Sequence, residues 1–252
     1  MKSIYITGGA SGIGLALARL YSAQGCIVGI QDILDIADLQ SLATDLKRLG
    51  GDIFLYSCSV TDSEKTRNSI ISFAKKAGSL DIIYVHAGKV PQEEEGLSQH
   101  TIAEYIETNY YGALNAIFPA IEIMKVAGGT IVTSNSIGSL VSTQNSGAYS
   151  ASKAALKMYI DSLRLNPNLR LINFLDATLG FVNTASIRNH KHAILILTCQ
   201  PIYCAQKLAI SVQEKRKTVL IPRMRSIPWV LLSIAPLRVK FLILANAKKL
   251  FR

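Results

Sequence analysis

The sequence predicts an α/β fold: a single domain with one doubly wound parallel sheet of about seven strands and helices on both faces. Segments typical of strands alternate with segments typical of helices, which indicates parallel strands joined by helical crossovers. The strand-like runs are continuously apolar, as expected where both faces of a sheet are covered. The chain has 252 residues, of which 49% are hydrophobic, so it can form one large core.

The expected elements follow one another in this alternating order. The first strand is an apolar run that ends in a glycine turn, and the helix after it stops before Gly25. Asp62, which stands between two hydroxyl residues, is suited to cap the third helix. The expected strands are 4–6, 26–30, 53–56, 81–85, 130–133, 169–175 and 218–221. The expected helices are 15–23, 36–48, 63–77, 100–126 and 148–164.

The composition excludes several classes of protein. Abundant apolar residues and a mean hydropathy of +0.28 exclude a disordered chain. Four cysteines are too few for a disulfide scaffold. None belongs to a Cys-x-x-Cys pair, which argues against a zinc site or a dithiol redox motif, and no metal is expected. Scattered thiols and an N-terminus without a secretory signal predict a cytoplasmic protein.

Positive charge is concentrated in the C-terminal part of the chain. Residues 186–252 contain 13 Lys and Arg against one acidic residue, whereas residues 1–185 contain 14 against 16. The basic part either is a solvated face or meets an anionic partner, such as a membrane surface, an acidic carrier protein or an anionic substrate. Nucleic acid is not expected, because no Arg-rich run alternates with aromatic residues.

Residues 223–252 are expected to form an apolar, basic C-terminal extension. Its uncharged runs are separated by Arg238 and Lys240, and each of these would cost about 3 kcal/mol at the centre of a bilayer. No spanning helix is therefore expected. Two uses remain open: the extension lies on an anionic membrane surface, or it covers the core or a subunit interface.

A glycine-rich stretch lies between the first strand and the first helix, and it reads Thr7-Gly8-Gly9-Ala10-Ser11-Gly12-Ile13-Gly14. Glycines let a backbone approach a phosphate closely, and the N-terminus of a helix offers unpaired N–H groups. In this position the stretch predicts a Rossmann-type dinucleotide site rather than a turn without a ligand. The residues expected to contact the dinucleotide here are Gly8, Ser11, Gly12, Ile13 and Gly14.

Asp32, at the end of the second strand, indicates which dinucleotide binds. A carboxylate in this place accepts hydrogen bonds from the ribose hydroxyls and repels a 2′-phosphate. Ser11 offers no positive charge to such a phosphate. NAD is therefore the expected cofactor, with NADP less favoured. The alternative use of Asp32 is a surface turn or cap.

Three polar residues after the fifth strand form a candidate catalytic set. Tyr149 and Lys153 are four residues apart, so they share one face of the expected helix. Chance alone gives about 0.6 such pairs in a chain of this composition, so the spacing carries little weight by itself. The position of the pair is the stronger evidence for a catalytic role. Ligands of open parallel sheets bind beyond the carboxyl ends of the strands, and Ser136 also lies there.

Together these features resemble the short-chain dehydrogenase/reductase family of NAD(P)-dependent oxidoreductases. The resemblance covers roughly residues 3–184. It depends on an ordered set: the glycine stretch, Asp32, Ala87-Gly88, Asn109, Ser136, Tyr149 and Lys153. It implies an enzyme that transfers a hydride between the nicotinamide and a secondary alcohol or ketone, assembled as a homodimer or homotetramer.

The resemblance implies a role for each matching residue. Tyr149 would exchange a proton with the substrate oxygen, Lys153 would favour its phenolate and bind the nicotinamide ribose, and Ser136 would orient the substrate. Asn109 would anchor a water between Lys153 and solvent. The other residues expected at the cofactor are Ser59, Val60, Ala87, Gly88, Gly180, Val182 and Thr184, the last two beside the carboxamide.

Three positions depart from the family pattern of Asp-Val, Asn-Ala-Gly and Pro-Gly; they read Ser59-Val60, His86-Ala87-Gly88 and Leu179-Gly180. Ser59 is expected either to weaken the adenine contacts or to shift them to the backbone of Val60, and Leu179 is expected to loosen the nicotinamide side. His86 is expected to replace the asparagine by bonding the same backbone; the alternative is that it acts as a new catalytic group. The departures motivate an alternative function, an NAD-binding regulatory protein with little or no catalysis.

Residues 185–205 are expected to form the substrate loop of the single NAD(P)-binding domain, 1–252. Their apolar run, 193–197, favours an apolar or lipid-like substrate. The basic residues before it, 190–192, either are solvated or meet an anionic group.

Overall fold

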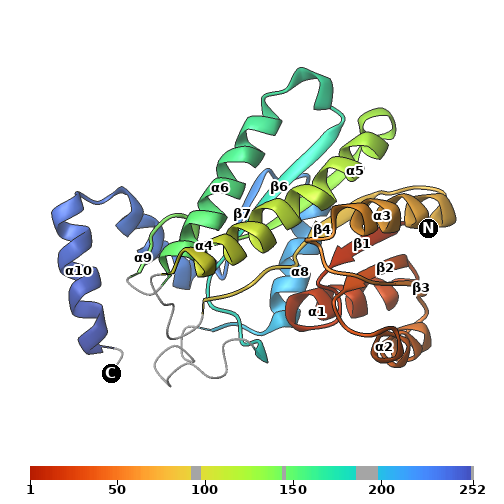
Figure 1. Cartoon of the computed structure of the whole chain (residues 1–252), viewed down its shortest axis with the longest axis horizontal. Helices are drawn as coiled ribbons and strands as arrows, with labels where there is room; N and C mark the ends of the chain where they lie inside the picture. Colours follow the sequence, from red (N-terminus) through yellow and green to blue (C-terminus); the bar gives the residue numbers. More distant parts are fainter. Residues whose placement is uncertain (92–97, 144–145, 186–197, 251–252) are drawn as a thin grey trace.

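The fold is one parallel sheet covered by helices, as the sequence predicts. A computed structural model describes residues 1–91, 98–143, 146–185 and 198–250. In this part of the chain the sheet has seven strands in the order β3-β2-β1-β4-β5-β6-β7, and neighbouring strands are parallel (Figure 1). The strands are β1 (Ser3–Thr7), β2 (Ile27–Asp32), β3 (Asp52–Ser57), β4 (Ile82–Val85), β5 (Gly129–Ser136), β6 (Ile172–Leu179) and β7 (Thr218–Ile221).

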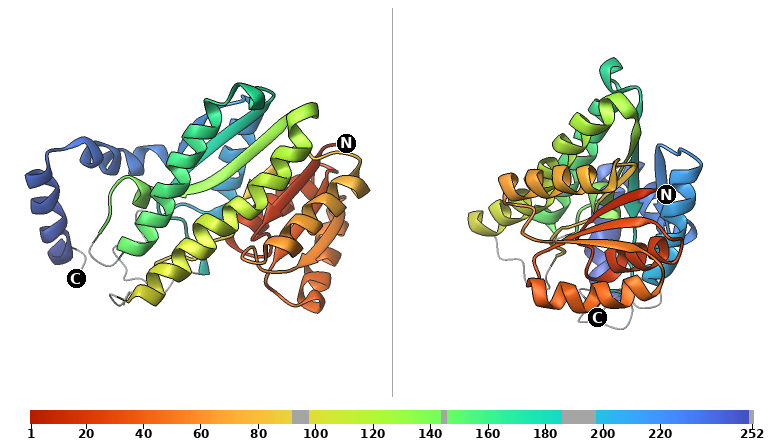
Figure 2. Two further views of the ribbon diagram at one scale, coloured as in Figure 1. Left: turned by 45° about the horizontal axis from the view of Figure 1, so that its top comes forward. Right: turned by 90° about the vertical axis from the view of Figure 1, so that its right-hand side faces the viewer.

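Helices lie on both faces of the sheet, as Figure 2 shows from two further directions. Helices α1, α2 and α8 pack on one face, and α3, α5 and α6 pack on the other. Each helix that packs on the sheet buries a stripe of apolar residues spaced three or four positions apart. The described helices are α1 (Gly12–Ser22), α2 (Ile36–Arg48), α3 (Ser63–Ala77), α4 (Gln99–Ile106), α5 (Gly112–Ala127), α6 (Gly147–Arg164), α8 (Pro201–Gln213), α9 (Arg223–Ile234) and α10 (Leu237–Leu250).

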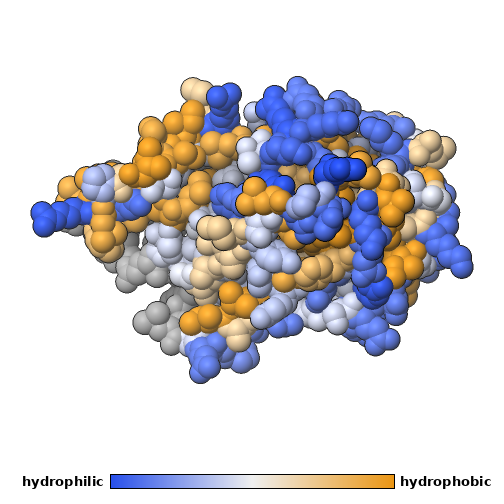
Figure 3. Space-filling view, turned by 90° about the horizontal axis from the view of Figure 1, so that it is seen from above, coloured by the Kyte–Doolittle hydropathy of each residue, from blue (hydrophilic) through white to orange (hydrophobic). Residues whose placement is uncertain are grey.

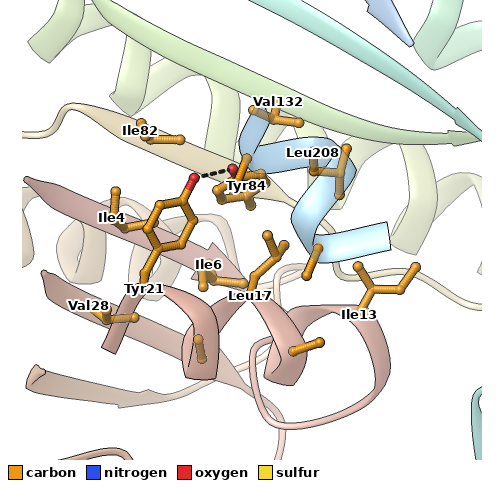
Figure 4. Packing of buried hydrophobic residues seen from close by; sticks show 14 of the residues in the cluster. Ile4, Ile6, Ile13, Leu17, Tyr21, Val28, Ile82, Tyr84, Val132 and Leu208 are labelled. Carbon is orange, nitrogen blue, oxygen red and sulfur yellow. Dashed lines mark hydrogen bonds between the residues drawn. The ribbon is translucent and has the colours of Figure 1, made fainter. Parts of the chain in front are cut away.

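Apolar side chains fill the space between the sheet and helices α1 and α8 (Figure 4). Ile6, Leu17 and Leu208 are fully buried there, and burial of such a side chain stabilises the fold by about 1.5–3 kcal/mol. The hydroxyls of Tyr21 and Tyr84 lie 2.6 Å apart in the same core, so each has a hydrogen-bond partner. This packing fixes α1, and with it the glycine stretch that precedes the helix.

Most of the expected elements differ from the observed ones by a few residues at their ends, and two of these differences have a plain structural reason. The expected helix 100–126 is divided into α4 and α5 by a π-helical turn, Glu107–Tyr111. The expected strand 169–175 begins later, as β6, because Pro167–Leu169 forms a 3₁₀ turn before it.

A further difference lies in the expected substrate loop 185–205. Its last residues, 201–205, belong to the first turns of α8. Pro201 stands at the first helical position, where its missing N–H removes no helical hydrogen bond.

The C-terminal extension consists of two helices. Helix α9 lies beside the end of β6, where Trp229 meets Phe181 edge-on with ring centroids 6.2 Å apart. Helix α10 projects from the body of the molecule (Figure 1). Within the described ranges, no helix is both long and apolar enough to cross a membrane.

Candidate active site

One cavity lies at the carboxyl ends of the central strands. The strand order reverses between β1 and β4, which is where open parallel sheets bind their ligands. Most of the predicted site residues line this cavity: Gly8, Ser11, Gly12, Ile13, Ala87, Gly88, Ser136, Tyr149, Lys153, Gly180, Val182 and Thr184. The predicted residues outside this lining are Gly14, Asp32, Ser59, Val60 and Asn109.

The glycine stretch forms a cradle that fits a dinucleotide phosphate. The N–H of Gly8 donates to the carbonyl of Gln31 at 2.8 Å, which turns the chain tightly after β1. Gly8 has a φ of +69°, and a Cβ there would stand 2.9 Å from the Cα of Ala87, so a side chain does not fit. Helix α1 begins at Gly12, and the side chain of Ser11 makes no capping bond to it. The first turn of α1 therefore keeps N–H groups for an anion such as a pyrophosphate.

Asp32 lies beside this cradle, and the backbone holds its carboxylate. Oδ2 accepts from the N–H of Ala10 at 3.0 Å, and Oδ1 accepts from the N–H of Ile33 at 2.8 Å. Each carboxylate oxygen has a second acceptor site, which suits the hydroxyls of an adenosine ribose.

Tyr149 and Lys153 lie in the first two turns of α6 and line the cavity together with Ser136, the last residue of β5. The Lys153 ammonium donates to the carbonyl of Ser134 at 3.0 Å and lies 6.0 Å from the centre of the Tyr149 ring. Burial lowers the pKa of Lys153 to about 8, and the charge of Asp176 opposes this shift. Burial raises the pKa of Tyr149, and a hydrogen bond with Ser136 opposes it. Tyr149 therefore keeps its proton at neutral pH unless further positive charge enters the cavity.

Asn109 lies in the π-helical turn between α4 and α5, a kind of irregularity that often marks functional sites. Its Oδ1 accepts from the N–H of Lys89 at 2.7 Å, and its Nδ2 donates to the carbonyl of Lys89 at 3.1 Å. The same Nδ2 lies 3.1 Å from the hydroxyl of Ser152, which donates to the carbonyl of Tyr149 at 2.7 Å. Asn109 thus joins the segment after β4 to the helix that carries Tyr149.

Sequence reasoning missed the polar groups behind this set. Ser134 accepts from Lys153, as above, and its hydroxyl lies 2.8 Å from Nδ1 of His86. Asp176, on β6, is 1% exposed and accepts from Thr133 at 3.2 Å and from Asn135 at 3.1 Å. Burial raises the pKa of Asp176, although these hydrogen bonds oppose the shift. One feature of the sequence could have indicated these polar groups: the apolar fifth strand ends in polar residues.

The contact of His86 differs from the expected one. Its ring was expected to bond the backbone, but Nδ1 meets the hydroxyl of Ser134, while the N–H of His86 donates to Oγ1 of Thr7 at 3.0 Å. Burial and then the charge of Lys153 lower the pKa of His86 to about 4. The imidazole is therefore neutral at neutral pH.

This imidazole is expected to make the fold less stable in weak acid. An unfolded histidine has a pKa near 6.5, so the unfolded chain binds a proton there below that pH. In the folded chain His86 binds a proton only near pH 4 and below. The free energy of unfolding therefore falls as the pH falls, by about 2 kcal/mol between pH 7 and pH 5. Denaturant unfolding of His86→Asn should lack this part of the pH dependence. His100→Asn, at the exposed start of α4, is the matched control, and equal pH dependence in both variants would contradict the prediction.

The other two departures keep ordinary local structure. The hydroxyls of Ser59 and Thr61 lie 2.8 Å apart in the turn before α3. The carbonyl of Val60 accepts from the side chain of Asn115 at 2.9 Å. Leu179 lines the cavity with an apolar surface.

The expected substrate loop lies largely outside the described residues, which end at 185 and resume at 198; this includes the apolar run 193–197 and the basic residues 190–192. Across the described ranges, no three His, Cys, Asp or Glu side chains gather as a metal site requires.

Comparison with known proteins agrees with this geometry. A family model described as short chain dehydrogenase matches residues 2–194. The chain belongs to this family. An alcohol dehydrogenase of the archaeon Thermococcus sibiricus, solved with 5-hydroxy-NADP, has the same short-chain dehydrogenase fold. The TM-score is 0.78 at 21% identity, over 88% of this chain and 96% of that one.

Sequence relatives of this short-chain dehydrogenase are longer than the segment they share with it. An uncharacterised oxidoreductase of Mycobacterium bovis is 31% identical over 194 residues, which are 74% of this chain and 56% of the relative. The cis-4-hydroxycyclohexanecarboxylate dehydrogenase of Sinomonas cyclohexanicum is 34% identical over 155 residues, which are 60% of this chain and 61% of the relative. The chain thus spans about three fifths of the length of these relatives.

Proposed function

We propose that this short-chain dehydrogenase transfers a hydride between NAD(H) and a secondary alcohol or ketone, with Tyr149 as general acid and base. The observation that carries the proposal is that Ser136, Tyr149 and Lys153 line the same cavity as the glycine cradle. The test is a panel of secondary alcohols and ketones with each cofactor, followed by the absorbance of the reduced nicotinamide. Cofactor binding without turnover on any member would favour the alternative, an NAD-binding regulatory protein.

Each side chain of the set has its own task. A dinucleotide held by the glycine cradle would supply or accept the hydride at the carbon that bears the substrate oxygen. Tyr149 gives a proton to that oxygen in reduction and takes it in oxidation. The Lys153 ammonium favours the phenolate of Tyr149, and Ser136 bonds the substrate oxygen and orients it.

A water beside Lys153 would connect the site to solvent. A Cβ at Gly88 would stand 2.8 Å from Oδ1 of Asn109 and 3.4 Å from Nζ of Lys153. Because residue 88 is a glycine, no side chain comes between these two polar atoms. Oδ1 accepts one hydrogen bond from Lys89 and keeps a second acceptor site, which supports a role for Asn109 in holding this water.

We propose NAD rather than NADP as the cofactor, on the strength of Asp32. In a thermal-shift titration, NAD and NADH should raise the melting temperature at concentrations at least about tenfold lower than NADP and NADPH. Asp32→Ser should reduce this selectivity, because it removes both the ribose acceptor and the charge that repels a 2′-phosphate. Asp35→Ser is the matched control, since Asp35 is exposed and its side chain caps no helix. Equal stabilisation of the unaltered protein by NAD and NADP would contradict the preference.

We propose an apolar or lipid-like substrate, and the described wall of the cavity supports this proposal. Val90, Leu179 and Val182 present apolar surface there, and apolar walls favour apolar ligands. One sequence relative is named for a hydroxycyclohexanecarboxylate, which is a secondary alcohol on an apolar ring that also carries a carboxylate.

We further propose that the C-terminal helices hold this cytoplasmic protein on an anionic membrane surface. On α10, Leu237 and Phe241 are about two thirds exposed and stand next to Arg238 and Lys240. Figure 3 shows hydrophobic and hydrophilic side chains side by side on the projecting end of the molecule. Apolar area and positive charge together favour the surface of anionic lipid.

Vesicle co-sedimentation tests this proposal. The protein should bind vesicles that contain phosphatidylserine, and Phe241→Glu and high salt should each weaken binding by about tenfold or more. Leu165→Glu, at the exposed end of α6, is the matched control and should bind like the unaltered protein. Light scattering distinguishes the competing use of the same surface, self-association into a dimer or tetramer, which would persist without lipid.

A further inference from the structure

Two free cysteines lie against each other at the edge of the cofactor cavity. The Sγ atoms of Cys199 and Cys204 are 3.3 Å apart. Cys204 lies in the first turn of α8 and is fully buried, whereas Cys199 precedes the helix and is half-buried. The sequence argued against a dithiol motif because the two are five residues apart, but the turn into α8 brings them together.

The backbone of Cys199 is hydrogen-bonded to a segment that forms part of the cavity wall. Its N–H donates to the carbonyl of Phe181 at 3.1 Å, and its carbonyl accepts from the N–H of Asn183 at 2.8 Å. These bonds place Cys199 directly beside Val182, and both Val182 and Thr184 line the cavity. A displacement of Cys199 therefore displaces the wall that is expected to hold the carboxamide.

The two sulfurs differ in chemical character. A hydrogen bond from Cys204 and, after it, the charge of Arg225 lower the pKa of Cys199. The guanidinium of Arg225 also donates to the carbonyl of Thr198, the residue before Cys199. The bond with Cys199 and burial raise the pKa of Cys204. Cys199 is therefore the more nucleophilic thiol and the one that solvent reaches.

We propose that Cys199 and Cys204 form a redox-active dithiol, which hydrogen peroxide converts into an intramolecular disulfide that reshapes the cofactor cavity. The Cys199 thiolate attacks one peroxide oxygen, so that an S–O bond forms, the O–O bond breaks and the other oxygen leaves as water after taking a proton. The sulfur of Cys204 then attacks this sulfur, the S–O bond breaks, and the Cys204 proton leaves with the second water. Two thiols and one hydrogen peroxide thus give one disulfide and two waters.

The geometry predicts which partner moves. A disulfide requires a sulfur separation of about 2.05 Å, so the two atoms must approach by more than an ångström. Cys204 is held in α8, which packs into the core. We therefore expect Cys199 to move toward Cys204, and this movement disturbs its hydrogen bonds to Phe181 and Asn183. In a reducing cytosol such a disulfide is transient and reversed by thiol exchange, as regulatory disulfides are.

Mass spectrometry tests the site itself, independently of any enzymatic activity. Residues 192–207 form one tryptic peptide that contains both cysteines and no other. After the full-length protein is treated with hydrogen peroxide, this peptide should lose two hydrogens and resist alkylation, and dithiothreitol should reverse both changes. Cys199→Ser and Cys204→Ala should each abolish the loss, whereas Cys58→Ser should not. An intact dithiol, under conditions that oxidise free dithiothreitol, would overturn the proposal.

A second readout tests the link to the cavity, and it rests on the proposed NAD binding. After oxidation of the unaltered protein, a concentration of NAD about tenfold or more higher should be needed to raise its melting temperature to the same extent. Reduction should restore the original response. Cys199→Ser should bind NAD equally well before and after peroxide. A complete disulfide with unchanged NAD binding would overturn the link, whereas absence of NAD binding in the reduced protein would count against the proposed function instead.

Discussion

Replacing Tyr149 by phenylalanine is expected to reduce cofactor-coupled turnover by about 10²–10⁴-fold while leaving cofactor binding unchanged. The variant loses the hydroxyl that exchanges a proton with the substrate oxygen. The ring remains, with its edge-on contact to Tyr105 at 6.2 Å between centroids. Lys153 keeps its bond to the carbonyl of Ser134, so the cofactor side of the cavity is preserved.

The measurement combines two assays on one variant. Initial rates with the best substrate of the panel report the chemical step, and thermal shift with NAD reports binding. Tyr159→Phe is the matched control, because Tyr159 lies on the same helix but packs against Tyr110 and Phe118. Rates of Tyr149→Phe within about tenfold of the unaltered protein would show that another group moves the proton.

The fold could be predicted because its signals are local. Apolar runs of strand length, helical spacing between them and a glycine turn after the first strand are each visible in a few neighbouring residues. The candidate site was predictable in the same way, since Tyr149 and Lys153 share one helix face and Ser136 ends a strand. Parallel strands bring such ends to one edge of the sheet, so the sequence order of these residues suffices to group them.

Sequence reasoning missed features that leave little or no trace in neighbouring residues. The π-helical turn at Asn109 follows from one extra residue in a helical pattern that otherwise continues. Asp176 sits within an apolar strand, and its role appears only when Thr133 and Asn135 of the neighbouring strand supply its hydrogen bonds. Helix α8 did carry a signal, Pro201 before apolar residues at helical spacing. The expected substrate loop took in its first residues, 201–205, and no helix was expected over the rest.

Gly14→Ala is expected to destabilise the fold and to abolish dinucleotide binding together. A Cβ at Gly14 would stand 2.0 Å from the carbonyl oxygen of Gly8 and 3.0 Å from the Cα of Gly9. These atoms belong to backbone that the bond from Gly8 to Gln31 holds in place, so no side chain can rotate away. Either α1 or the cradle must shift, and overpacking of this kind costs about 1–3 kcal/mol or more. For a domain of this size, the melting temperature should fall by roughly 5–10 °C.

Gly147→Ala separates this clash from the general effect of an added methyl group. Gly147 is the first residue of α6, and no atom lies near the position that its Cβ would take. Its melting temperature and its response to NAD should stay unchanged or rise slightly, because alanine favours a helix. Thermal denaturation with and without NAD measures both variants. If Gly14→Ala melted at a lower temperature but responded to NAD like the unaltered protein, the predicted loss of binding would be wrong. The clash would then be relieved by a shift of α1 that leaves the glycine cradle able to bind the phosphates.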